Sequence, residues 1–118
     1  MLRVKNEIKA KKLINQIESI IGQKVMNVSV ERYWKDDELM EANFVTHFTD
    51  DMTEAEATVV SLQLVHNLGY RWSVGYPGYV NVSGHDQPVW NFEGICNKTR
   101  ITGVEWVLIN LFTRTDDV

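Results

Sequence analysis

The first part of the chain has the spacing of an amphipathic helix. Apolar residues recur at intervals of three and four and so share one helical face: Ala10, Leu13, Ile14, Ile17, Ile20 and Ile21. Asn6 can cap the first turn with its side chain. Gly22 can end the helix because glycine adopts a positive φ without a steric clash. The pattern predicts a helix between Asn6 and Gly22.

After Gly22 the apolar period changes from helical spacing to two. One alternating run contains Met26, Val28, Val30, Arg32 and Trp34, and a second contains Met40, Ala42, Phe44, Thr46 and Phe48. A period of two with β-branched residues predicts strands. The polar segment 35–38 separates the runs, so we predict a β-hairpin whose turn lies at Lys35 to Glu38.

A second helix follows the hairpin. Thr53 and Glu56 have the spacing of a capping box, in which each side chain bonds the backbone amide of the other residue. The predicted buried stripe consists of Ala57, Val60, Leu64, Val65 and Leu68. Gly69 is expected to end this helix.

The C-terminal half is rich in strand patterns. Segments 70–76, 79–83 and 89–96 predict strands, and Pro77 with Gly78 marks a turn between the first two. Segment 104–112 is apolar on both parities, which suits a buried strand, although its length would allow a helix. Its β-branched residues favour the strand.

Together these segments predict one α+β domain covering residues 1–118. The order α-β-β-α-β-β-β-β is expected to form an antiparallel sheet of about five strands, with two helices packed on one face.

Composition indicates a globular protein of a reducing compartment. Apolar residues make up 44% and charged residues 24% of the chain. No run approaches the ~20 apolar residues of a membrane span, and Met1 to Lys5 do not lead into the apolar stretch of a signal peptide. Cys96 is the only cysteine and cannot form an internal disulfide. We expect a cytoplasmic protein without membrane contact.

Charge is distributed unevenly along the chain. Residues 1–35 contain eight basic and three acidic residues, whereas residues 36–96 contain ten acidic residues against Arg71 alone. An acidic middle segment would repel nucleic acid and attract a basic protein surface. The alternative is that these acids merely solvate loops and helix starts.

Few residues suggest chemistry. Cys96 with His47, His66 or His85 could pair a nucleophile with a base, but none lies in a catalytic signature. His85 and Asp86 are adjacent in a predicted loop, with no third partner visible. No pair of histidines has the helical spacing of a metal site. We predict no catalytic residue, cofactor or metal, and a small-ligand or enzymatic role using His85, Asp86 and Cys96 stays open as an alternative.

Aromatic residues recur within or beside the predicted strands along the chain. The series comprises Tyr33-Trp34, Arg71-Trp72-Ser73-Val74, Val89-Trp90-Asn91-Phe92-Glu93-Gly94 and Gly103-Val104-Glu105-Trp106. Over residues 25–112 this pattern resembles small immunity proteins of bacterial polymorphic-toxin and contact-dependent growth inhibition systems. The resemblance implies a cytoplasmic protein that binds a cognate toxin domain, typically a nuclease, and covers its active or substrate-binding surface.

A second resemblance suggests a different origin for a binding protein. Segment 64–75, with its Leu-Gly-Tyr-Arg-Trp centre, is similar to small phage-encoded proteins. That resemblance implies a phage anti-defence inhibitor as the alternative function.

The predicted partner-binding site combines an aromatic anchor with acidic residues. Trp34 stands beside the acidic turn, an arrangement expected of a hot spot that faces a basic surface. Charged residues near the end of the hairpin's second strand are expected to extend the site. Its members are Trp34, Asp36, Asp37, Glu38, Asp50, Asp51 and Glu54. Lys35 is the only local base expected to offset the acids of the turn.

Overall fold

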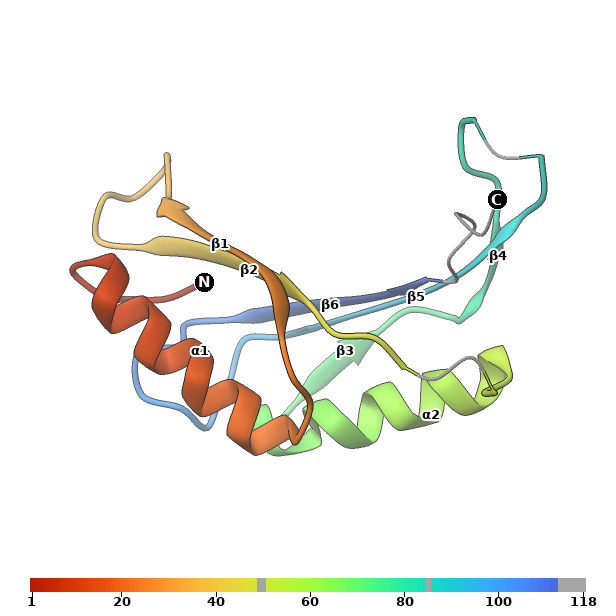
Figure 1. The fold of residues 1–118 in the computed structure, drawn as a ribbon, viewed down its shortest axis with the longest axis horizontal. Coiled ribbons are helices and arrows are strands. Elements are labelled where there is room, and N and C mark those ends of the chain that lie inside the picture. The colour runs from red at the N-terminus through yellow and green to blue at the C-terminus, as the bar shows by residue number, and fades with distance from the viewer. Residues whose placement is uncertain (49–50, 85, 113–118) are drawn as a thin grey trace.

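The computed structural model describes residues 1–48, 51–84 and 86–112 (Figure 1). Its elements are α1 (Glu7–Ile21), β1 (Met26–Arg32), β2 (Met40–Val45), α2 (Glu54–Val65), the 3-10 turn η1 (His66–Leu68), β3 (Trp72–Val74), β4 (Gly78–Val80), β5 (Val89–Cys96) and β6 (Val107–Phe112). The order α-β-β-α-β-β-β-β is the predicted one, which confirms the α+β class.

The six strands form two antiparallel sheets rather than one, while their number and order agree roughly with the predicted sheet of about five strands. β1 pairs only with β2, and the other four strands form a second sheet in which β3, β4 and β6 each pair with β5. β3 and β4 pair with different halves of one edge of β5, while β6 pairs with residues 91–96 along the other edge. No hydrogen-bonded ladder joins β2 to β6 among the described residues.

Helix α1 has the predicted caps. The Asn6 side chain accepts a hydrogen bond from the Lys9 amide at 2.9 Å. Gly22 takes a φ of 69° and donates its amide to the Glu18 carbonyl. The helix buries Ala10, Ile14, Ile17 and Ile21.

Helix α2 begins with the predicted capping box, but only part of the predicted stripe is buried, at Val65 and, beyond the helix, at Leu68. Thr58, Ser61 and Val65 are buried, whereas the predicted Ala57, Val60 and Leu64 are only half-buried. The two hydroxyls tolerate burial because each donates to a carbonyl of its own helix, at 2.9 Å for Thr58 and 2.8 Å for Ser61. Trp90 of β5 also donates its indole N–H to the Thr58 hydroxyl. The buried face of α2 therefore includes two hydroxyl residues that hydrophobicity alone does not predict.

Strand β1 departs from strict alternation. Asn27 has a φ of 54°, and the register with β2 shifts between Met26 and Ser29. Such a bulge interrupts the period of two. Met26 and Val28 are consequently exposed, whereas Val30 packs against the core.

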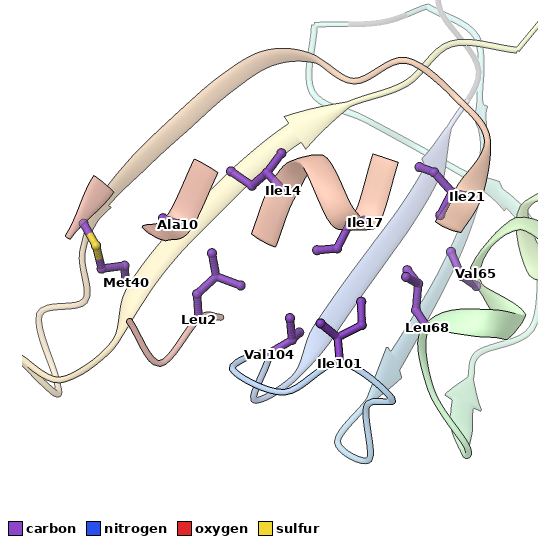
Figure 2. Close-up of a cluster of buried hydrophobic side chains, with 10 residues drawn as sticks. All are labelled: Leu2, Ala10, Ile14, Ile17, Ile21, Met40, Val65, Leu68, Ile101 and Val104. Carbon is purple, nitrogen blue, oxygen red and sulfur yellow. The ribbon is translucent and has the colours of Figure 1, made fainter. Parts of the chain in front are cut away.

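The core lies between α1, the start of β2 and the segment before β6 (Figure 2). Its buried members are Leu2, Ala10, Ile14, Ile17, Ile21, Met40, Val65, Leu68, Ile101 and Val104. Helices α1 and α2 lie along the same side of the two sheets, and the opposite side is left uncovered by helices (Figure 1). None of the described helices is long and apolar enough to cross a membrane.

Residues 1–3 link the two sheets. Leu2 forms isolated antiparallel bridges to Met40 on one side and to Val104 on the other. On the Val104 side, the Arg3 amide donates to the Gly103 carbonyl and the Glu105 amide donates to the Met1 carbonyl. This short segment therefore fills one end of the gap between β2 and β6 as an extra strand.

Candidate partner-binding surface

The turn between β1 and β2 has a defined backbone geometry. The Tyr33 amide donates to the Leu39 carbonyl at 2.9 Å, and the Leu39 amide donates to the Asp36 carbonyl at 3.1 Å. The Asp36 carboxylate accepts from the Glu38 amide at 2.9 Å. One of the three predicted acids is thus part of the turn's own hydrogen bonding.

Trp34 projects into solvent at this turn. Its relative exposure is 83%, against 2–8% for the buried core residues that surround α1. The neighbouring Tyr33 ring lies 6.2 Å away, tilted by 55°, and the Lys35 ammonium stands 4.9 Å from the centre of the indole. The structure places Trp34 in the turn rather than in the strand that its alternation predicted.

A basic residue from outside the turn, Arg3, offsets one of its acids, contrary to the expectation that Lys35 alone does so. Arg3 forms an ion pair with Glu38 at 3.1 Å and a second with Glu105 at 2.5 Å. The hydrogen bond and charge of Glu105 raise the pKa of the Arg3 guanidinium. The sequence hides this compensation because Arg3 belongs to the N-terminal segment.

Arg32 stabilises the turn by donating hydrogen bonds to backbone carbonyls. Its guanidinium donates to the Asp37 carbonyl at 2.9 Å and to the Lys5 carbonyl at 3.1 Å. The Asp37 carboxylate itself has no hydrogen bond or ion pair with the rest of the described chain and is exposed. Asp37 is therefore the acid of the turn whose charge is directed to solvent.

The structure does not bring the remaining predicted residues to this turn. Asp51 and Glu54 lie at the start of α2, beyond the far end of β2, while the hairpin turn lies at the opposite end of the molecule (Figure 1). Glu54 stands in the first helical turn, where an acidic residue favours the helix dipole. Asp50 lies outside the described residues.

The uncovered face carries acidic and apolar residues that sequence analysis missed. Glu31 and Glu41 stand directly opposite each other on β1 and β2. Like charges in this position destabilise a sheet, so the pair is a feature that stability alone does not favour. Their neighbours Val30 and Ala42 pack against the core, which places both glutamates on the opposite face.

The uncovered face of the larger sheet also carries acidic and apolar residues. Glu93 pairs with Asn110, and Ile95 pairs with Leu108, at positions that alternate with the core-facing residues. Leu108 is 58% exposed, an unusual environment for leucine in the middle of a strand. The sequence signal for this exposed apolar face was the presence of apolar residues at both odd and even positions of segment 104–112. We interpreted that pattern as a strand buried on both faces.

A groove separates β2 from β6. It encloses a volume of about 270 Å³, and its walls are residues 42–48 on one side and 108–112 on the other. Ile17 and Ile21 of α1 and Leu64 of α2 also line it. Before the start of β6, the Met1 amino group donates to the Trp106 carbonyl at 2.9 Å. Burial lowers the pKa of this amino group, although the negative charges of Glu41 and Glu105 act in the opposite direction.

The residues considered for chemistry are not assembled into a site. Cys96 is fully buried, and a Cβ on Gly69 would come within 2.2 Å of its sulfur. Its thiol donates weakly to the Lys98 carbonyl, so packing accounts for its position. No group of three or more His, Cys, Asp or Glu side chains is placed to hold a metal ion in the part of the chain that the structure describes. His85 lies outside that part.

Comparison with known proteins adds no relative. No protein-family model, no curated protein and no solved structure matches this chain.

Proposed function

We propose that this protein is an immunity protein that binds a cognate bacterial toxin domain and neutralises it by covering its active or substrate-binding surface. The toxin is a nuclease with a basic surface, and the pair acts in the cytoplasm without contact to membrane or nucleic acid. The observation that carries the proposal is the 83% exposure of Trp34 in a turn that contains three acidic residues.

An exposed tryptophan of this kind suits a protein interface. Tryptophan is enriched among residues that dominate binding energies. Leaving it in water forgoes about 1.5–3 kcal/mol or more of hydrophobic stabilisation that burial of a large apolar side chain provides. A partner surface that covers Trp34 recovers that contribution.

The charges around Trp34 favour a basic partner. Asp37 offers a carboxylate with no partner among the described residues, and Glu31 and Glu41 add two more negative charges on the adjacent strands. A nuclease that binds phosphates needs a basic groove, and complementary charge accelerates association with such a groove.

The bracing of the turn supports the same role. Arg32 holds the Asp37 and Lys5 carbonyls, and Arg3 holds Glu38 and Glu105, so the tip is ordered before any partner arrives. A pre-ordered binding element loses less conformational entropy on association.

Cell survival tests the proposal directly. A toxin domain encoded next to this gene, which the proposal predicts, is expressed from an inducible promoter, with and without this protein, in a host that has neither. We expect survival only when the protein is present. Death of cells that contain folded protein at the level of the toxin would contradict the proposal.

Two charge-reversal variants test, in the same survival assay, whether the hairpin turn belongs to the binding site. Asp37→Lys changes an unpartnered acid of the turn, and Asp86→Lys makes the same change in the exposed loop between β4 and β5, at the other end of the molecule (Figure 1). We expect Asp37→Lys to require more protein for survival and Asp86→Lys to behave like the parent. Equal behaviour of the two variants would remove the turn from the binding site.

A further inference from the structure

We propose that the groove between β2 and β6 receives an extended segment of the partner protein, which completes one continuous sheet by strand addition. The inference rests on the proposed function only for the identity of that partner. It is carried by the backbone of the groove itself, because part of the same gap is already filled by a strand of this chain.

Residues 1–3 show how the gap is filled. Leu2 bonds the Met40 backbone on the β2 side, while its neighbours bond Gly103 and Glu105 on the other. Both flanking segments run antiparallel to residues 1–3 and hence parallel to each other. One added strand can therefore pair in antiparallel fashion with both edges, in line with residues 1–3.

The β2 wall presents unused backbone groups. Met40 directs its N–H and C=O away from β1, since both bond Leu2 at 2.8 Å. Every second residue of a strand faces the same edge. Ala42 and Phe44 therefore direct their backbone groups into the groove, and no partner strand lies there among the described residues.

The β6 wall presents a matching row. Glu93 accepts a hydrogen bond from Gly75 on the β3 side of β5, so the next residue of β5 directs its backbone groups to β6, where its partner is Ile109. Leu108 and Asn110, on either side of Ile109, consequently direct theirs into the groove. Two open edges that face each other across an apolar floor form a template for a further strand.

The residues that line the groove indicate which side chains the added strand should carry. Its floor contains Ile17, Ile21 and Leu64, so alternate side chains of the added strand should be apolar. The hydroxyl of Thr46, which also lines the groove, is buried with no hydrogen-bond partner in the described structure. Such an orphan group favours an occupant with polar backbone atoms.

The outward side of the added strand should carry basic residues. Glu41 of β2 lies one residue before the groove wall and Glu93 lies on β5, both on the uncovered face. The volume of about 270 Å³ falls below the roughly 300–1,000 Å³ of pockets that enclose small ligands. An extended peptide with alternating apolar and basic residues fits these features better than a compact molecule.

A defined peptide provides the test. The probe is a seven-residue peptide of alternating lysine and valine with blocked ends, added to ¹⁵N-labelled protein. The amides of Ala42, Phe44, Leu108 and Asn110 should shift, and their hydrogen exchange should slow about tenfold or more as they become hydrogen-bonded. The same peptide with N-methyl groups on alternate amides should have little effect, because it lacks the donors of one edge.

Variants of the groove edge separate backbone from side-chain effects. Asn110→Pro removes the amide that faces the groove, whereas Asn110→Ala removes only the side chain. We expect Asn110→Pro to weaken peptide binding roughly fivefold to tenfold, as the loss of one hydrogen bond implies, and Asn110→Ala to bind like the parent. If Asn110→Pro fails to fold, Ala42→Pro on the opposite wall provides the same test. Ala42→Ser is then the control variant.

Three results would overturn the inference. They are absence of peptide binding, equal effects of the methylated peptide, and groove amides whose protection in the free protein rises with protein concentration, which would make a second copy the occupant. None involves the toxin, so a failure here leaves the survival test of the proposed function standing. A failed survival test likewise leaves the groove result intact.

Discussion

Leu2 and Met40 exchange two backbone hydrogen bonds, each 2.8 Å long, which join the start of the chain to the first residue of β2. Leu2 is also 2% exposed and belongs to the core. The N-terminal segment is thus both a strand between the sheets and a packed part of the interior. Stability should depend strongly on it.

Truncation of Leu2 should destabilise the fold. Leu2→Ala is expected to lower the free energy of unfolding by about 2–5 kcal/mol, as for other buried leucines. Ile8→Ala, on the exposed side of α1 at 69% exposure, should change it by only about 0.5 kcal/mol. Denaturant unfolding measures both. Similar midpoints for the two variants would show that residues 1–3 do not pack as described.

Gly69 and Cys96 should be energetically coupled. A Cβ on Gly69 would lie 2.2 Å from the Cys96 sulfur, so Gly69→Ala should cost about 1–3 kcal/mol through overpacking. Cys96→Ala removes that sulfur, and part of the cost should disappear in the double variant. Strictly additive unfolding free energies would contradict the packing at this contact.

Removal of the residues considered for chemistry should leave neutralisation unchanged. Cys96→Ala and Asp86→Ala alter a buried packing residue and an exposed loop residue, neither of which belongs to the proposed interface. The survival assay reads the outcome, with melting temperature as the check on folding. Loss of protection by a folded variant would favour the enzymatic alternative.

Charge reversal at Asp37 should act mainly on association. The change Asp37→Lys should slow association with the toxin domain and leave the dissociation rate much less affected, since an exposed rim charge acts through steering. The difference from the parent should shrink as salt rises, because the Debye length falls from ~10 Å at 0.1 M to ~3 Å at 1 M. Stopped-flow association at two salt concentrations measures this, and a rate equal to the parent's at low salt would exclude steering by Asp37. Reversal of Glu38 is less clean, because its partner Arg3 would then face a positive charge.

Local patterns predicted most elements because the signals are local. Asn6, Gly22, Thr53 and Glu56 act within their own helices, and their roles were visible in the sequence. The division into two sheets was not predictable in this way. Residues 1–3, which bridge the two sheets, carry no strand pattern and are placed by partners distant in the sequence.

The candidate site was predictable only in part. The turn and its acids followed from alternation and composition, but its electrostatics depend on Arg3 and Arg32, which reach it from other elements. The same holds for α2, where Thr58 is buried and accepts a hydrogen bond from the indole N–H of Trp90 on β5. Interactions between elements decide such details, and the sequence order does not reveal them.

The affinity of the Trp34 variant tests the central claim most directly. Titration calorimetry with the toxin domain compares the parent, Trp34→Ala and Tyr76→Ala, a matched loss of an exposed aromatic between β3 and β4, away from the hairpin turn (Figure 1). Trp34→Ala should weaken binding by about 2 kcal/mol or more, as expected of a hot spot, while its melting temperature stays near that of the parent. Tyr76→Ala should bind like the parent. Equal affinities for all three proteins would contradict the claim that the hairpin turn is the partner-binding site.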